Sequence, residues 1–107
     1  MIPESDVEKA LDYMRDHAEV AAKAKAERIY VTEYRKTLKA DLMKMSNGKT
    51  AVEREEFAYS HETYKQFLVA IKEAVYQDEK ARFMLLAAQA KIDAWRTQEA
   101  SSRHGFN

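Results

Sequence analysis

Apolar residues recur at spacings of three and four along the second half of the chain, from residue 60 to residue 101. No glycine or proline interrupts this stretch. The spacing places the apolar side chains on one face of an α-helix roughly 60 Å long, at about 1.5 Å per residue. Such a helix is unstable alone in water, so the pattern predicts that another element covers this face. The apolar positions are Tyr64, Phe67, Leu68, Ile71, Ala74, Val75, Ala81, Leu85, Ala88, Ile92 and Trp95.

A second helical pattern, over residues 6–46, supplies that cover. A capping-box sequence at residues 5–8 precedes it, and Asn47 or Gly48 is suited to a left-handed cap at its end. In the middle of this helix the heptad pattern meets charged residues. Steps of four residues through Ala18, Ala22, Ala26 and Tyr30 bridge the gap. We expect the helix to stay continuous there while its contact face rotates or its supercoil relaxes.

The connection between the two long helices contains a short helix of its own, residues 51–58. It follows a second capping box, from Thr50 to Glu53, and Ser60 is expected to cap the long helix after it. Two long helices with so short a connection fold back as an antiparallel hairpin. The sequence therefore predicts an all-α hairpin of residues 6–46 and 60–101.

The closed end of the hairpin sets its register. Placing Met45 beside Tyr64 brings Tyr34 near Val75. The same register pairs Leu42 with Phe67, Leu38 with Ile71, and Met14 with Trp95.

The composition agrees with a helical chain, because 34% of the 107 residues are charged and only three are glycine or proline. We expect one domain, residues 1–107, with residues 1–5 and 102–107 flexible. A two-helix hairpin leaves several large apolar side chains of the second helix uncovered. Assembly into a homodimer or a higher helical bundle is the usual remedy. The uncovered residues, called the apolar set below, are Val69, Tyr76, Phe83, Met84 and Leu86.

Asp78 interrupts the apolar stripe of the second helix. By the predicted register it lies near Arg28, where the stripe of the first helix also becomes polar. A half-buried Arg28–Asp78 ion pair would fix the register at some cost in stability. Alternatively, Asp78 lies at the edge of the stripe and is solvated.

Charge is unevenly spread along the first helix although the formal net charge is zero. Residues 1–22 hold six acids and two bases, whereas residues 23–49 hold eight bases and three acids. Lysine and arginine side chains interleaved with Tyr30 and Tyr34 can bind phosphates, and the tyrosines can stack on unpaired nucleobases. This stretch is therefore a candidate surface for single-stranded DNA. The alternative is an ordinary solvated helix face. The residues concerned, called the basic set below, are Lys25, Arg28, Arg35, Lys36 and Lys39.

No catalytic, metal or cofactor site is expected from the sequence. The chain has no cysteine, and His17, His61 and His104 lack metal-ligand spacing or a nearby serine nucleophile. No apolar run is long enough to span a membrane, and the first ten residues contain no signal-peptide core. These features favour a non-enzymatic cytoplasmic protein with neither a small-molecule substrate nor a membrane partner.

Two segments resemble small uncharacterised proteins of tailed phages and prophages. The first runs from Thr50 to Glu55 and continues with Tyr59, Tyr64 and Lys65. The second covers residues 86–103, including its Ile-x-x-Trp-Arg-x-x-Glu-Ala element. Such proteins are often encoded among recombination and DNA-processing genes, so the resemblance implies a DNA-metabolism accessory role in the host cytoplasm. It implies no catalytic residues.

Two functional hypotheses follow. The first is a non-enzymatic phage accessory protein that assists DNA recombination or replication by binding nucleic acid or a recombination enzyme. The second is an adaptor or inhibitor of a host protein, which would dock on the uncovered apolar surface of the second helix.

Overall fold

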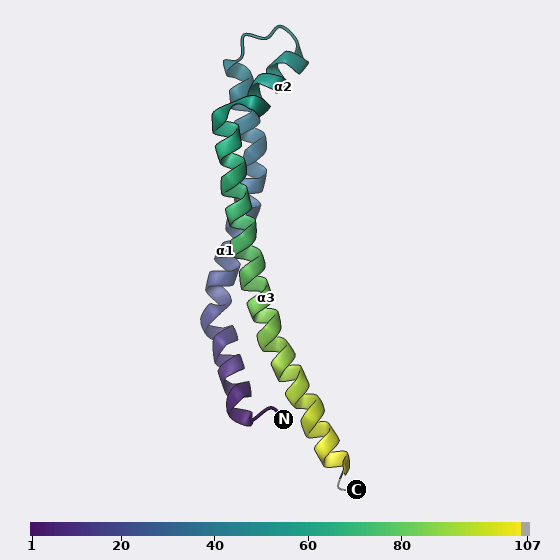
Figure 1. Cartoon of the computed structure of the whole chain (residues 1–107). Helices are drawn as coiled ribbons and strands as arrows, with labels where there is room; N and C mark the ends of the chain where they lie inside the picture. Colours follow the sequence, from purple (N-terminus) through teal and green to yellow (C-terminus); the bar gives the residue numbers. More distant parts are fainter. Residues whose placement is uncertain (106–107) are drawn as a thin grey trace. The chain divides into compact units, whose positions relative to one another are not determined.

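The computed structural model describes residues 1–105, which form three α-helices and no strand. Helix α1 spans Glu4–Met45, α2 spans Ala51–Ser60, and α3 spans Glu62–Gly105 (Figure 1). The predicted all-α helical hairpin, with a short helix between two long ones, is confirmed. Helix α3 continues past the predicted end at residue 101 and stops at a glycine. Residues 106–107, expected to be flexible, lie outside the described residues.

Helix α1 begins earlier than predicted. The backbone N–H of Asp6 donates to the carbonyl of Pro3 at 3.0 Å, so Ser5 lies inside the first turn. The predicted capping box at residues 5–8 is therefore wrong. Pro3 suits a position just ahead of the helix, because it has no N–H to satisfy and its φ is already close to helical.

The link from α1 to α2 uses no left-handed residue. Positive φ is absent from the described part of the chain, so the predicted left-handed cap at Asn47 or Gly48 is wrong. Instead, Ser46 Oγ accepts a hydrogen bond from the N–H of Gly48 at 3.0 Å. Gly48 is needed for space, since a Cβ there would lie 2.8 Å from the Cβ of Glu53.

The predicted cap of α2 is confirmed with one difference. Thr50 Oγ1 accepts the N–H of Glu53 at 3.1 Å, as in a capping box. The Glu53 carboxylate, however, accepts from the N–H of Lys49 at 2.7 Å rather than from that of Thr50.

His61, not Ser60, separates α2 from α3. Ser60 is the last residue of α2, and its hydroxyl donates back to the carbonyl of Glu56 at 2.7 Å. His61 is extended, with φ −68° and ψ 139°, and its Nδ1 accepts the N–H of Thr63 at 3.1 Å. An imidazole therefore caps α3 where a hydroxyl was expected.

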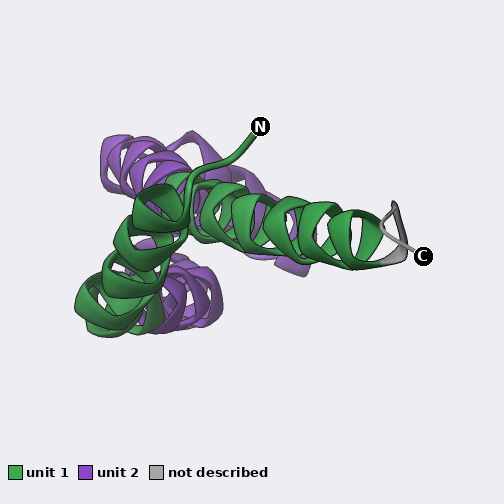
Figure 2. Ribbon diagram, turned by 90° about the horizontal axis from the view of Figure 1, so that it is seen from below, with its two compact units in different colours: residues 1–23, 79–107 green, residues 24–78 purple. Residues whose placement is uncertain are grey.

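Contacts divide the chain into two compact units (Figure 2). Unit 1 combines residues 1–23 with residues 79–107, and unit 2 is Ala24–Asp78. In each unit a segment of α1 packs against a segment of α3. The expectation of a single domain stays a prediction.

The core of unit 2 forms where α2 joins the long helices. Leu42, the fully buried Ala58 and Tyr64 make one cluster, and Leu38 and Met43 pack against it. Tyr64 therefore meets Leu42, whereas the predicted register placed it beside Met45.

The register error continues along unit 2. The Tyr34 ring contacts Phe67, with 5.7 Å between ring centroids, whereas the predicted neighbour was Val75. The cause is α2: Ala58 occupies the space at the closed end, so the first residues of α3 pair further back along α1 than a bare turn would allow.

The core of unit 1 contains Val7, Ala10, Ala88 and Ile92. The partly buried residues packed against this cluster are Ile2, Tyr13, Met14 and Trp95. Met14 and Trp95, paired in the predicted register, thus share one core. Ile2 is also held by Gln98, whose Oε1 accepts from its N–H at 2.8 Å and whose Nε2 donates to its carbonyl at 3.0 Å.

Helix α1 is continuous through its middle, as predicted, but the predicted path of four-residue steps is wrong. All four residues on the predicted path, from Ala18 to Tyr30, are exposed. The buried side instead follows Ala21, Ala24, Arg28 and Val31 in alternating steps of three and four. Arg28 was left out of the predicted stripe because it is charged.

Candidate interaction surface

Arg28 and Asp78 form an ion pair in unit 2. Arg28 Nε donates to Asp78 Oδ2. Asp78 is the one buried charged residue in the described part of the chain. Its side chain is 11% exposed and that of Arg28 is 35% exposed. The alternative of a solvated Asp78 is therefore wrong, and the pair explains how a charged residue occupies the contact stripe of α1.

The apolar set is exposed throughout. Its five side chains have between 47% and 66% of their surface accessible. Val69 and Tyr76 belong to the α3 segment of unit 2, and Phe83, Met84 and Leu86 belong to that of unit 1. Within each segment these side chains lie off the buried side of α3, which contains Ala74 and Ala88.

The members of the basic set differ in whether they have a carboxylate partner. Arg28 is held by Asp78, and Lys36 Nζ lies 3.1 Å from Glu33 Oε2. Lys25 and Arg35 are exposed, and no carboxylate oxygen of the described residues lies within 4.0 Å of either. The set therefore offers two unpaired cations rather than a continuous basic surface.

Lys39 belongs to the contact between α1 and α2. Its ammonium lies 4.8 Å from the centroid of the Tyr59 ring and 3.6 Å from Glu55 Oε1. Hydrogen bonding with the Tyr59 side chain, reinforced by the Glu55 charge, raises the pKa of Lys39 above its ordinary value. This lysine stays charged and serves the structure of unit 2.

Helix α1 also carries Tyr30 and Tyr34, which lie between Lys25 and Arg35 in the sequence. Their rings stack with 6.0 Å between centroids and 19° between planes. Tyr30 is 63% exposed although the pattern assigned it to the contact stripe. Its exposure was missed because the predicted contact stripe left out the charged Arg28 and included Tyr30 in its place.

The histidines have local roles. His17 stacks on Tyr13, with ring centroids 3.9 Å apart, and its Nδ1 lies 2.9 Å from the carbonyl oxygen of Tyr13. His61 caps α3. Among the described residues, no group of three or more His, Asp or Glu is placed to hold a metal ion. The side chain of His104 lies outside the description.

None of the described helices has the length and apolar character needed to cross a membrane. Comparison of the chain with known protein families, with characterised proteins and with solved structures gives no match.

Proposed function

We propose that the protein is a non-enzymatic interaction module that binds another protein through the apolar set on α3. The observation that carries the proposal is the exposure of all five of these large apolar side chains. Single exposed apolar residues are common on proteins, but Phe83, Met84 and Leu86 lie close together in the α3 segment of unit 1, and such a concentration is typical of a binding surface. A partner helix is the usual occupant of such a face.

The resemblance of residues 50–65 and 86–103 to phage proteins supplies the proposed context. In it, the partner is a phage or host DNA-processing protein, and the two meet in the host cytoplasm. Self-association through the same apolar set, giving a homodimer or a higher helical bundle, is part of the proposal. Covering these side chains removes apolar surface from water, which favours association by about 25 cal/mol per Å².

A charge-introducing variant tests the surface directly. In Phe83→Glu/Leu86→Glu, two carboxylates would have to be buried against the partner, so capture of the partner and self-association should both be lost. Leu11→Glu/Ile29→Glu is the matched control, since it changes two exposed apolar residues of α1 and adds the same charge. Both variants should keep the helical circular dichroism of the parent protein.

The readouts are light scattering for self-association and photo-crosslinking from position 76 in infected cells for other partners. Equal loss of crosslinked partner in the test and control variants would contradict the proposal. So would a monomer that yields no specific crosslink.

Binding of single-stranded nucleic acid is the second candidate, favoured by the exposed stack of Tyr30 and Tyr34 on a helix that also carries the unpaired Lys25 and Arg35. Stacking on a base contributes about 1–3 kcal/mol per aromatic side chain. Phosphate contacts make affinity fall as the salt concentration rises. For a single strand, the logarithm of the binding constant falls with the logarithm of the salt concentration by a slope of about 0.7 per contact.

A salt titration with a labelled oligonucleotide tests this candidate. Lys25→Glu/Arg35→Glu should reduce the salt slope by about 1.4 if both cations contact phosphates. Lys65→Glu/Lys72→Glu, with the same charge change elsewhere on unit 2, should leave the slope nearly unchanged. Failure of the parent protein to bind at low salt would remove this candidate.

A further inference from the structure

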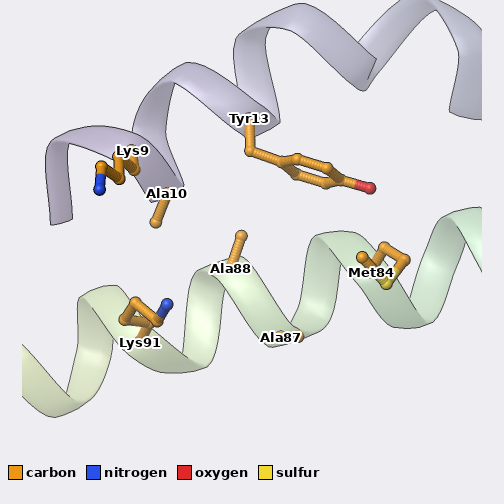
Figure 3. A pocket seen from close by; sticks show the side chains of 7 residues that line it. All are labelled: Lys9, Ala10, Tyr13, Met84, Ala87, Ala88 and Lys91. Atoms are coloured by element: carbon orange, nitrogen blue, oxygen red, sulfur yellow. The ribbon is translucent and has the colours of Figure 1, made fainter. Parts of the chain in front are cut away.

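Unit 1 has a groove of about 280 Å³ between α1 and α3 (Figure 3). Its lining is mainly apolar. Ala10, Ala87 and Ala88 contribute methyl groups, and Tyr13 and Met84 lie toward one end. Because the alanines are small, the backbone of a bound segment could approach the groove closely.

Two lysines, one from each helix, stand at the other end of the groove. Lys9 comes from α1 and Lys91 from α3 (Figure 3). Among the described side chains, no carboxylate oxygen lies within 4.0 Å of either ammonium group. Lys23, by contrast, has Glu19 Oε1 at 3.1 Å. The groove therefore combines an apolar surface with a positive end that lacks a counter-charge.

We infer that this groove binds an amphipathic helix of the partner, with apolar side chains over the alanines and a carboxylate at Lys9 and Lys91. The inference rests on the proposed function and names the chemistry of its partner. Charge complementarity requires an acidic residue at the lysine end. A helix in a groove presents anchors at positions i, i+3 or i+4, and i+7, so it can place both kinds of side chain at once.

The surroundings of the groove favour a helix over a single alkyl chain. Phe83, one helical turn before Ala87 on the same segment of α3, is also exposed. A helix is about 10 Å wide and can cover Phe83 together with the groove, whereas one alkyl chain would leave it in water. Met84 can adapt to the shape of the partner because its side chain is unbranched and flexible.

The experiment uses the full chain and two fluorescent model peptides of about four helical turns. Both peptides carry the same leucines on one face, flanked by glutamates in one and by lysines in the other. The glutamate peptide should bind, as measured by anisotropy. Lys9→Glu/Lys91→Glu should weaken that binding about tenfold and shift the preference toward the lysine peptide, because two attractions become repulsions.

Lys65→Glu/Lys72→Glu is the control for general electrostatics, since it makes the same charge change on unit 2. It should retain binding of the glutamate peptide. Equal weakening in the two variants would overturn the inference, and so would equal binding of the two peptides to the parent protein. Binding of laurate that depends on Lys9 and Lys91 and displaces the peptide would identify a fatty-carboxylate site instead.

Failure here is distinguishable from failure of the proposed function. If the glutamate peptide does not bind but Phe83→Glu/Leu86→Glu still abolishes capture of a partner, the apolar set binds proteins without the groove. The groove inference is then wrong while the interaction function stands.

Discussion

Breaking the Arg28–Asp78 ion pair should cost unequal free energies from its two ends. Arg28→Met leaves the Asp78 carboxylate, whose side chain is 11% exposed, without its partner. Losing one member of a buried pair costs about 3–5 kcal/mol. The remaining access of this pair to solvent puts the expected loss at the lower end, about 3 kcal/mol.

Asp78→Leu should cost less than about 1 kcal/mol, in the range of exposed pairs. The orphaned Arg28 side chain is 35% exposed, so its guanidinium can turn to water while its aliphatic part still covers the leucine. The double variant Arg28→Met/Asp78→Leu should lie within about 1 kcal/mol of the parent protein, because apolar replacements of buried pairs are close to neutral. The two changes should therefore be coupled by about 2–3 kcal/mol.

Urea unfolding followed by circular dichroism measures these differences through the midpoint, provided that the slope of the transition is unchanged. The reasoning is refuted if Asp78→Leu is as costly as Arg28→Met, or if the two losses simply add. Light scattering on the same proteins tests a role in partner choice. That role is excluded if Asp78→Leu is more stable and keeps the parent oligomeric state.

Three further predictions concern the ends of the helices. Gly48→Ala should lower stability by about 1–2 kcal/mol, because the new Cβ would crowd that of Glu53; an unchanged melting temperature would show that the loop yields freely. Ala58→Leu should cost about 1–3 kcal/mol by overpacking. Ala40→Leu, at an exposed site of α1, is its control, and equal melting temperatures would contradict the core assignment. His61→Ala should cost about 1 kcal/mol while His61→Asn preserves the cap, and equal losses in thermal melts would argue against capping.

The helices were predictable because their signals are periodic and uninterrupted. Tyr64, Ala88 and Ile92 follow helical spacing, and their burial agrees with it. The ends of the helices were harder to predict. Ser5 is a residue type that is common at helix N-caps, but it lies inside a helix. His61 caps a helix although the neighbouring Ser60 has the more common side chain for that role.

The register was predicted only to within about a turn, because it depends on packing at the closed end. The position of Ala58 against Leu42 and Tyr64 decides it, and no local pattern reveals that α2 folds onto the long helices there. The Arg28–Asp78 contact was nevertheless found, since two charges interrupting two apolar stripes have few other partners. Their long side chains also tolerate an error in register that Tyr34 and Val75 do not.

The candidate surfaces were predictable to different degrees. The apolar set was identified from residues that a two-helix contact leaves uncovered, and these residues are exposed. The groove at Lys9 and Lys91 was missed, because it joins residues about 80 positions apart and depends on the register. Nothing in the local sequence distinguishes these lysines from other exposed lysines.

The packing of Ala58 between the long helices also sets an order of folding. Leu42 and Tyr64 close a short loop of the chain, whereas the hydrogen bonds between Ile2 and Gln98 join residues 96 positions apart. By the logarithmic dependence of loop-closure entropy on length, the distant pair costs about 1.3 kcal/mol more to bring together if it forms first. Folding should therefore start around α2 and proceed toward Ile2 and Gln98. Unfolding should run in the reverse order, so backbone amides near Ile2 and Gln98 should exchange hydrogen sooner than those around α2.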